Sequence, residues 1–157
     1  MKRGLLAILL MVSVSLSTAL AQTDVFGVGV VLGEPTGISA KVRLGPTSAV
    51  DAAAAWSFVD EGSFYFHADY LMHFPDVLTV DPGELPLYVG VGGMVSLRED
   101  PLLGIRIPVG LAYEFETAPL DVFFEIAPGM GIFPETSLEF GGGIGIRYYF
   151  GTSSAVG

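Results

Sequence analysis

Residues 137–150 read S-L-E-F-G-G-G-I-G-I-R-Y-Y-F, and from Leu138 to Phe150 the large apolar side chains fall on alternate positions. The positions between them carry Glu139, Arg147, Tyr149 and three glycines. Because successive side chains of a β-strand point to opposite faces of the sheet, this alternation predicts a strand with one apolar face and one polar or small face.

The same pattern repeats along the chain. Turn-forming clusters of Pro, Gly, Asp and Ser separate the alternating segments. We expect eight strands: Phe26–Gly33, Gly37–Leu44, Ala49–Phe58, Phe64–Phe74, Leu87–Arg98, Leu103–Glu116, Leu120–Ile132 and Ser137–Phe150. The 157 residues leave room for one domain, so the prediction is a single all-β structure.

Splitting each segment by parity gives two very different faces. The apolar set contains no charged residue, and the other set holds all five basic residues of the chain after residue 21. The second set is Gly27, Gly29, Ser39, Lys41, Arg43, Asp51, Tyr65, His67, Asp69, His73, Tyr88, Arg98, Arg106, Glu114, Glu116, Asp121, Glu125, Glu139 and Arg147. Opposite charges can pair on this face, whereas the apolar face is too continuous to line so narrow a barrel.

Composition favours the same orientation. The chain is 51% hydrophobic and 15% charged, with 21 glycines, which is unlike an ordinary soluble surface. No apolar run after residue 20 is long enough for a membrane-spanning helix, so a closed sheet is the remaining way to span a bilayer. The predicted fold is an eight-stranded antiparallel up-and-down transmembrane β-barrel, with the apolar set facing lipid.

The first 21 residues have the pattern of a cleaved signal peptide. Lys2 and Arg3 form a basic start, an apolar run follows from Leu5 to Val14, and residues 19–21 read A-L-A. We therefore expect a leader over 1–21 and a single outer-membrane barrel domain over 22–157. Cysteine is absent, which excludes disulfides, thiolate metal sites and the lipidated Cys of a lipoprotein.

Two groups of aromatic residues fit the rims of a membrane barrel. One group is Phe26, Phe74, Tyr113, Phe115, Tyr148 and Phe150, and the other is Trp56, Phe58, Phe64 and Phe66. With these features the chain resembles the small eight-stranded bacterial outer-membrane barrels of the OmpX, OmpW and OmpA membrane-domain type. The resemblance implies that Gly145, Tyr148 and Phe150 form the carboxy-terminal signal for the barrel-assembly machinery, although residues 151–157 follow that aromatic where most such proteins end.

An eight-stranded barrel is wide enough for its own side chains to fill, so the inward charges predict a packed polar interior. The simplest hairpin registers place Lys41 opposite Asp51 and Asp121 opposite Arg147, as ion pairs. Glu125 and Glu139 face glycines and have room to reach Arg106 or another base. The predicted interior ion-pair network is Lys41, Arg43, Asp51, Arg106, Glu114, Asp121, Glu125, Glu139 and Arg147.

Candidate catalytic and metal-ligating residues are few. His67, Asp69 and His73 share one face of a strand, but residues two apart lie about 6–7 Å from one another and the neighbouring strands offer mostly Ala and Tyr. We expect a polar core there, with no metal site and no cofactor. Ser57 and His67 are the nearest approach to a lipid-hydrolysing pair, but His67 opposes Ala55 in the simplest register, so we expect no catalytic residues and no enzyme.

The remaining features concern loops, partners and prolines. Acidic residues at Glu34, Asp60, Glu61, Glu99, Asp100 and Glu135 fall in predicted outer loops and could bind divalent cations that bridge to lipid phosphates. The net charge of −10, which becomes more negative without the leader, excludes nucleic acid as a partner. The connection from Pro75 to Pro86 falls on the periplasmic side. Pro108 and Pro128 interrupt predicted strands, and β-bulges are expected at both.

These expectations favour a function in the bacterial outer membrane, with its lipids and the assembly machinery as partners. The leading hypothesis is a barrel with a polar, side-chain-filled interior and a structural or surface-interaction role. The alternative is a narrow channel for small or hydrophobic compounds, of the OmpW kind. An enzyme that modifies lipid A is a third and weaker possibility.

Overall fold

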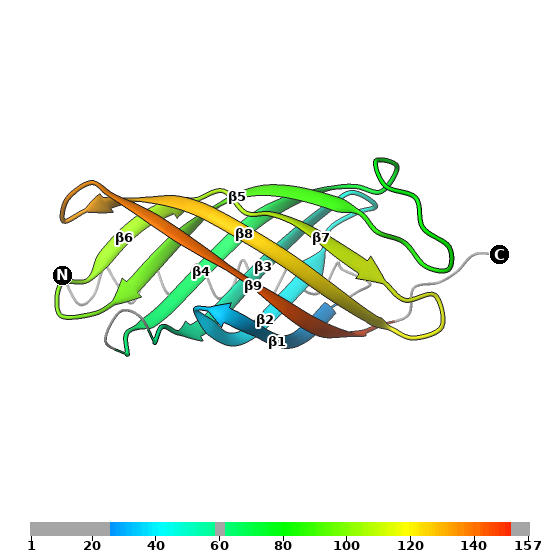
Figure 1. The fold of residues 1–157 in the computed structure, drawn as a ribbon, viewed down its shortest axis with the longest axis horizontal. Helices are drawn as coiled ribbons and strands as arrows, with labels where there is room; N and C mark the ends of the chain where they lie inside the picture. Colours follow the sequence, from blue (N-terminus) through cyan, green and yellow to red (C-terminus); the bar gives the residue numbers. More distant parts are fainter. Residues whose placement is uncertain (1–25, 59–61, 152–157) are drawn as a thin grey trace.

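The described part of the computed structural model, residues 26–58 and 62–151, contains nine antiparallel strands in one sheet (Figure 1). They are β1 (Phe26–Glu34), β2 (Thr36–Arg43), β3 (Ser48–Trp56), β4 (Phe64–Phe74), β5 (Leu87–Leu97), β6 (Leu102–Arg106), β7 (Val109–Glu114), β8 (Leu120–Phe133) and β9 (Ser137–Phe150). Within these ranges no helix is both long and apolar enough to cross a bilayer. The predicted leader lies outside the described residues.

The sheet closes on itself. Apart from β6 and β7, consecutive strands pair with each other, and β1 pairs with β9 from Phe26 opposite Phe150 to Glu34 opposite Gly142. β6 and β7 share one place in the ring, because both pair with β5 on one side and β8 on the other. The ring therefore has eight places, and the predicted all-β, up-and-down, eight-stranded barrel is confirmed.

The two prolines meet at the single break between β6 and β7. Ile107 donates its N–H to the carbonyl of Pro128, and Gly90 donates to the carbonyl of Pro108. The pairing register with β5 and β8 is the same before and after the break, so the bulges predicted at these prolines are wrong. Pro108 is one of the two residues of the break and Pro128 lies opposite the other, Ile107, so one interruption accommodates both missing N–H donors. The register shift lies elsewhere, between Leu103 and Gly104.

Two of the three predicted hairpin registers are observed. Lys41 lies opposite Asp51 in the β2–β3 pair, and Asp121 lies opposite Arg147 in the β8–β9 pair. The β3–β4 register differs by two residues, so His67 opposes Ala53, not Ala55. The turn between β3 and β4 sets this register. Its last backbone hydrogen bond runs from the Ser57 N–H to the carbonyl of Ser63.

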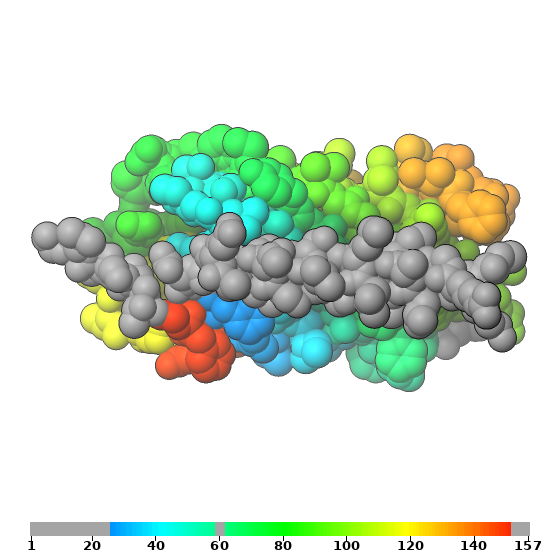
Figure 2. Space-filling model, turned by 180° about the vertical axis from the view of Figure 1, so that it is seen from behind, coloured from blue at the N-terminus to red at the C-terminus, as the bar shows by residue number. Residues whose placement is uncertain are grey.

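The two parity sets separate as predicted. Outward side chains are exposed, with Leu138 at 91% and Phe140 at 71%, whereas Arg147, Lys41 and Asp51 are almost completely buried. Figure 2 shows the barrel from behind, with the β8–β9 turn at one end and the β7–β8 turn at the other. Below, the end carrying the first residues of β1 and the last of β9 is the termini end, and the opposite end is the turn end. Glu116, predicted to face inward, lies beyond the end of β7 and is exposed.

Candidate functional site: the charged interior

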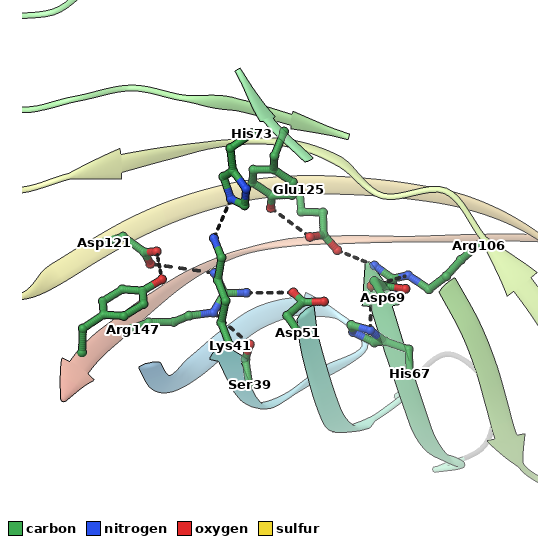
Figure 3. Close-up of polar contacts among 12 residues, drawn as sticks. Ser39, Lys41, Asp51, His67, Asp69, His73, Arg106, Asp121, Glu125 and Arg147 are labelled. Atoms are coloured by element: carbon green, nitrogen blue, oxygen red, sulfur yellow. Dashed lines mark hydrogen bonds and ion pairs between the residues drawn. The ribbon is translucent and has the colours of Figure 1, made fainter. Parts of the chain in front are cut away.

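Arg147 is the centre of the most buried cluster, which Figure 3 shows in close-up. The alternation of β9 points this side chain into the barrel, where it is 2% exposed. One terminal nitrogen lies 3.2 Å from Asp51 Oδ2, the other 3.8 Å from Asp121 Oδ1, and Nε donates to Ser39 Oγ at 3.0 Å. Its guanidinium also lies 3.8 Å from the ring centroid of Phe123. One arginine therefore ties together β2, β3, β8 and β9.

Lys41 and Asp51 oppose each other as expected, but the structure does not bring them together as an ion pair. The Lys41 ammonium lies 2.8 Å from His73 Nε2 and 5.5 Å from the centroid of the Tyr88 ring. Asp51 instead forms an ion pair with Arg147, whose side chain extends from β9. Register fixes which Cα atoms are opposite, but a long lysine side chain can reach a different strand.

Arg106 organises a second cluster toward the turn end. It lies 3.3 Å from Asp69 through Nε and contacts Glu125 through a terminal nitrogen. Tyr88 donates from its hydroxyl to the other oxygen of Glu125 at 2.8 Å. Glu125 thus reaches Arg106 across the lumen, as the hairpin geometry suggested. Asp69 was absent from the predicted network, although its inward parity was readable from the sequence.

The termini end is closed by a third group. Arg43 contacts Glu114 at 2.5 Å and lies 5.1 Å from the centroid of the Tyr149 ring. Tyr149 in turn donates a hydrogen bond to Asp121, which joins this group to the Arg147 cluster. Tyr149 was not among the residues predicted to face inward, and its role was missed. The tyrosine follows the alternation of β9, so parity could have identified it.

The turn end is more open. Arg98 lies 3.6 Å from Glu139, and both side chains are partly exposed. A cavity of about 590 Å³ opens beside them, lined in part by Glu99, Asp100 and Glu135. Glu34, expected in an outer loop, is instead the last residue of β1, and it accepts hydrogen bonds from the Ser57 hydroxyl and the Phe58 N–H. The predicted acids at positions 60 and 61 lie outside the described residues.

The interior below this mouth is occupied by side chains. Glycines create the space, because a Cβ at Gly110 would clash with the Tyr88 ring and one at Gly145 with the Phe123 ring. Three voids between these side chains are small, with volumes of about 180 Å³ around Ser57 and Ser96, 30 Å³ beside His67 and 70 Å³ near His73, and a cavity of about 350 Å³ lies beside Glu114 and Glu116. The cross-lumen ion pairs of Arg106 and Arg147 lie between the voids of the two ends.

The residues considered for catalysis are not brought together. Ser57 opposes Ser63, whereas His67 opposes Ala53, four positions further along the ladder. Four strand residues span about 13 Å, so a serine–histidine hydrogen bond is out of reach. The ligating side chains that do cluster among the described residues are Asp51, His67 and Asp69.

Comparison with known proteins supports the fold. No family model matches the chain, and no curated protein sequence matches it. Among solved structures, the crystal structure of the N-terminal β-barrel domain of Pseudomonas aeruginosa OprF matches at a TM-score of 0.65. The two chains are 16% identical, and the match covers 82% of this chain and 98% of that one. The chain therefore has the fold of an OmpA-type outer-membrane β-barrel.

Proposed function

We propose that this protein is exported through the leader at 1–21 and spans a bacterial outer membrane as a barrel with a filled interior, where it has a structural or surface-interaction role. The main observation behind the proposal is that the distribution of apolar and charged side chains is the reverse of that in a water-soluble protein. Large apolar side chains cover the outside of the ring, and the charged side chains are buried within it. A water-soluble barrel would do the opposite.

The outer surface has the features that a bilayer requires. Strands of 8 to 14 residues, with β6 and β7 acting as one, are long enough to cross the hydrocarbon layer when tilted. Aromatic side chains pair edge-on at both ends: Tyr113 with Phe115 and Tyr148 with Phe150 at the termini end, and Trp56 with Phe64 at the turn end. Aromatic belts of this kind suit the two membrane interfaces.

The interior favours a scaffold over a conduit. Buried ion pairs from Arg106 and Arg147 cross the lumen, and the voids beside them are small, with volumes of about 180 and 30 Å³. Partners then act on the surfaces of the barrel. Outer-membrane lipids contact its wall, and divalent cations bind the acids of the turn-end rim at Glu99, Asp100 and Glu135, which carry no basic neighbour in sequence except Arg98.

The assembly machinery is proposed to recognise β9. Phe150 and Tyr148 both face outward and are exposed, as a surface recognised by another protein requires. Gly145 faces inward under the Phe123 ring, which gives it a packing role of its own. Truncation after Phe150 tests whether the residues that follow affect assembly, with the amount of heat-modifiable barrel in the outer membrane as the measurement.

Cell fractionation combined with heat-modifiable gel mobility tests the proposed location. The protein is expected in the outer-membrane fraction, with a mobility that changes on boiling, and a soluble periplasmic band would overturn the proposal. Single-channel recording in planar bilayers tests the filled interior. No stable stepwise conductance is expected, whereas regular steps would favour the narrow-channel alternative.

A further inference from the structure

Asp51, His67 and Asp69 form a cluster of ligating side chains inside the barrel that the ion-pair network does not fully use. Asp51 on β3 and Asp69 on β4 are directly opposite each other, and His67 lies two residues away on the same face of β4. One ligand atom from each of the three lies within 4.8 Å of the others. We propose that these side chains bind a divalent transition-metal ion, with Zn²⁺ as the representative ion.

Each carboxylate has one oxygen beside an arginine and one without a hydrogen bond. Arg147 contacts Asp51 Oδ2 and Arg106 contacts Asp69 Oδ2. Asp51 Oδ1 and Asp69 Oδ1 are buried and accept no hydrogen bond, and both residues are only 2% exposed. Buried polar atoms are almost always satisfied, so a pair of free oxygens beside an imidazole requires an explanation. A bound cation supplies one.

The arginines do not compete with such an ion for the same atoms. Metal-ligating groups usually have partners of their own that fix their orientation. Here Arg147 donates to Asp51 Oδ2 at 3.2 Å, and Arg106 Nε lies 3.3 Å from Asp69 Oδ2. His67 Nδ1 lies 2.9 Å from Asp69 Oδ2, which orients the ring beside the free oxygens. Ligands bond to zinc at about 2.0–2.2 Å in a tetrahedral arrangement, which places ligand atoms about 3.3–3.6 Å apart. The three ligand atoms, which lie within 4.8 Å of one another, therefore need to close by up to about 1 Å.

Small residues leave room for the ion. His67 borders a void of about 30 Å³, a size that suits one water molecule, whose walls also include Ala53, Ala55, Arg106 and Glu125. Gly92 lies opposite Asp69, and a Cβ there would clash with Asp69 Oδ1. The space in front of the free oxygens therefore depends on residues without bulk.

The void adjoins a larger cavity on the side of the turn end. The two share Glu34 and Pro35, and the larger one, of about 180 Å³, also has Glu139 in its wall.

The ligand set selects the class of metal. An imidazole with two carboxylates suits Zn²⁺ and related transition metals, whereas Mg²⁺ and Ca²⁺ prefer sites made of oxygen atoms alone. The sequence predicted no metal site because it paired His67 and Asp69 with alanines. The observed register supplies Asp51 as the third ligand. The inference rests on this interior geometry and does not depend on the proposed function.

The test is a Zn²⁺ titration of the tag-free mature protein, folded in detergent and treated with chelator, followed by calorimetry. Wild type is expected to bind one Zn²⁺ per chain and to show no comparable binding of Mg²⁺. His67→Gln is expected to lower the affinity for Zn²⁺ by about 10-fold or more. The matched control is His73→Gln, which removes the chain's other histidine and should leave the affinity unchanged. Equal binding by wild type and His67→Gln, or equal losses in the two variants, would overturn the site.

A second measurement does not need a folded His67 variant. The chain has two histidines, so ¹⁵N labelling of histidine gives two imidazole spectra in wild type. Zn²⁺ is expected to shift the ring signals of His67 and leave those of His73, which bonds to Lys41, in place. Unchanged spectra, or equal shifts in both rings, would contradict the proposal.

Discussion

The middle of the barrel and its turn end use the same kinds of side chain in different surroundings. Arg147 is 2% exposed and is shared between two acids, whereas Arg98 and Glu139 have side chains 31% and 26% exposed and lie 3.6 Å apart. Water screens the second pair but not the first. The contribution of each ion pair to stability therefore depends more on its position along the barrel than on which residues form it.

Burial also makes the two regions respond differently to change. When a buried ion pair forms, the desolvation of the two charges offsets much of their attraction. Removing one partner, however, leaves an uncompensated charge in the interior. An exposed pair contributes about 0–1 kcal/mol, because its partners return to water when the pair is broken. The middle of the barrel should therefore be sensitive to single substitutions, and the turn end tolerant of them.

The largest effect is expected for Arg147→Ala. It removes the partner of Asp51 and Asp121 together, and the free energy of unfolding should fall by about 3–5 kcal/mol. Urea unfolding of the protein in lipid vesicles, followed by tryptophan fluorescence of Trp56, measures the change. Arg147→Lys keeps a positive charge and should lose less. An unfolding midpoint for Arg147→Ala equal to that of wild type would show that the buried cluster does not stabilise the fold.

The composition of this cluster was largely readable from the sequence, but its pairing only in part, because the contact of Arg147 with Asp121 was predicted and its contact with Asp51 was not. Parity placed Arg147, Asp51, Asp121 and Lys41 on the inward face, because strand geometry alone determines which face a residue occupies. Hairpin geometry then fixed the Cα register around Lys41 and Asp121. Which acid each base contacts depends on contacts across the closed ring, and these appear only when β1 pairs with β9.

The errors in the fold prediction have local causes. The β3–β4 register depended on where the connecting turn begins, and a difference of two residues moved His67 opposite Ala53. That difference also concealed the proximity of Asp51 to Asp69. The prolines were each assigned a separate bulge, because the sequence does not show that residues 108 and 128 lie beside the same break. Long alternating segments were predictable, whereas turns and irregularities were not.

Gly145→Ala tests the packing of the barrel's middle without changing any charge. A Cβ at Gly145 would clash with the Phe123 ring, which has the Arg147 guanidinium 3.8 Å from its centroid. Overpacking of this kind costs about 1–3 kcal/mol, measured by the same unfolding experiment. The matched control is Gly93→Ala, where the added carbon meets nothing closer than 3.9 Å and the change should stay within about 0.5 kcal/mol. Equal midpoints for the two variants would mean that the interior near Arg147 is loosely packed.

The smallest effect is expected for Glu139→Gln at the turn end. Glu139 accepts a hydrogen bond from Ser137 at 2.8 Å and pairs with Arg98, but its side chain is partly exposed. The glutamine can still accept from Ser137, so the variant removes mainly the charge. We expect the free energy of unfolding to fall by less than about 1 kcal/mol, and the difference to shrink as salt is raised because screening reaches exposed pairs first. Unfolding at low and high salt measures both. A loss as large as that of Arg147→Ala, unaffected by salt, would show that the turn end is as closed to water as the middle, and the contrast between the two regions would fail.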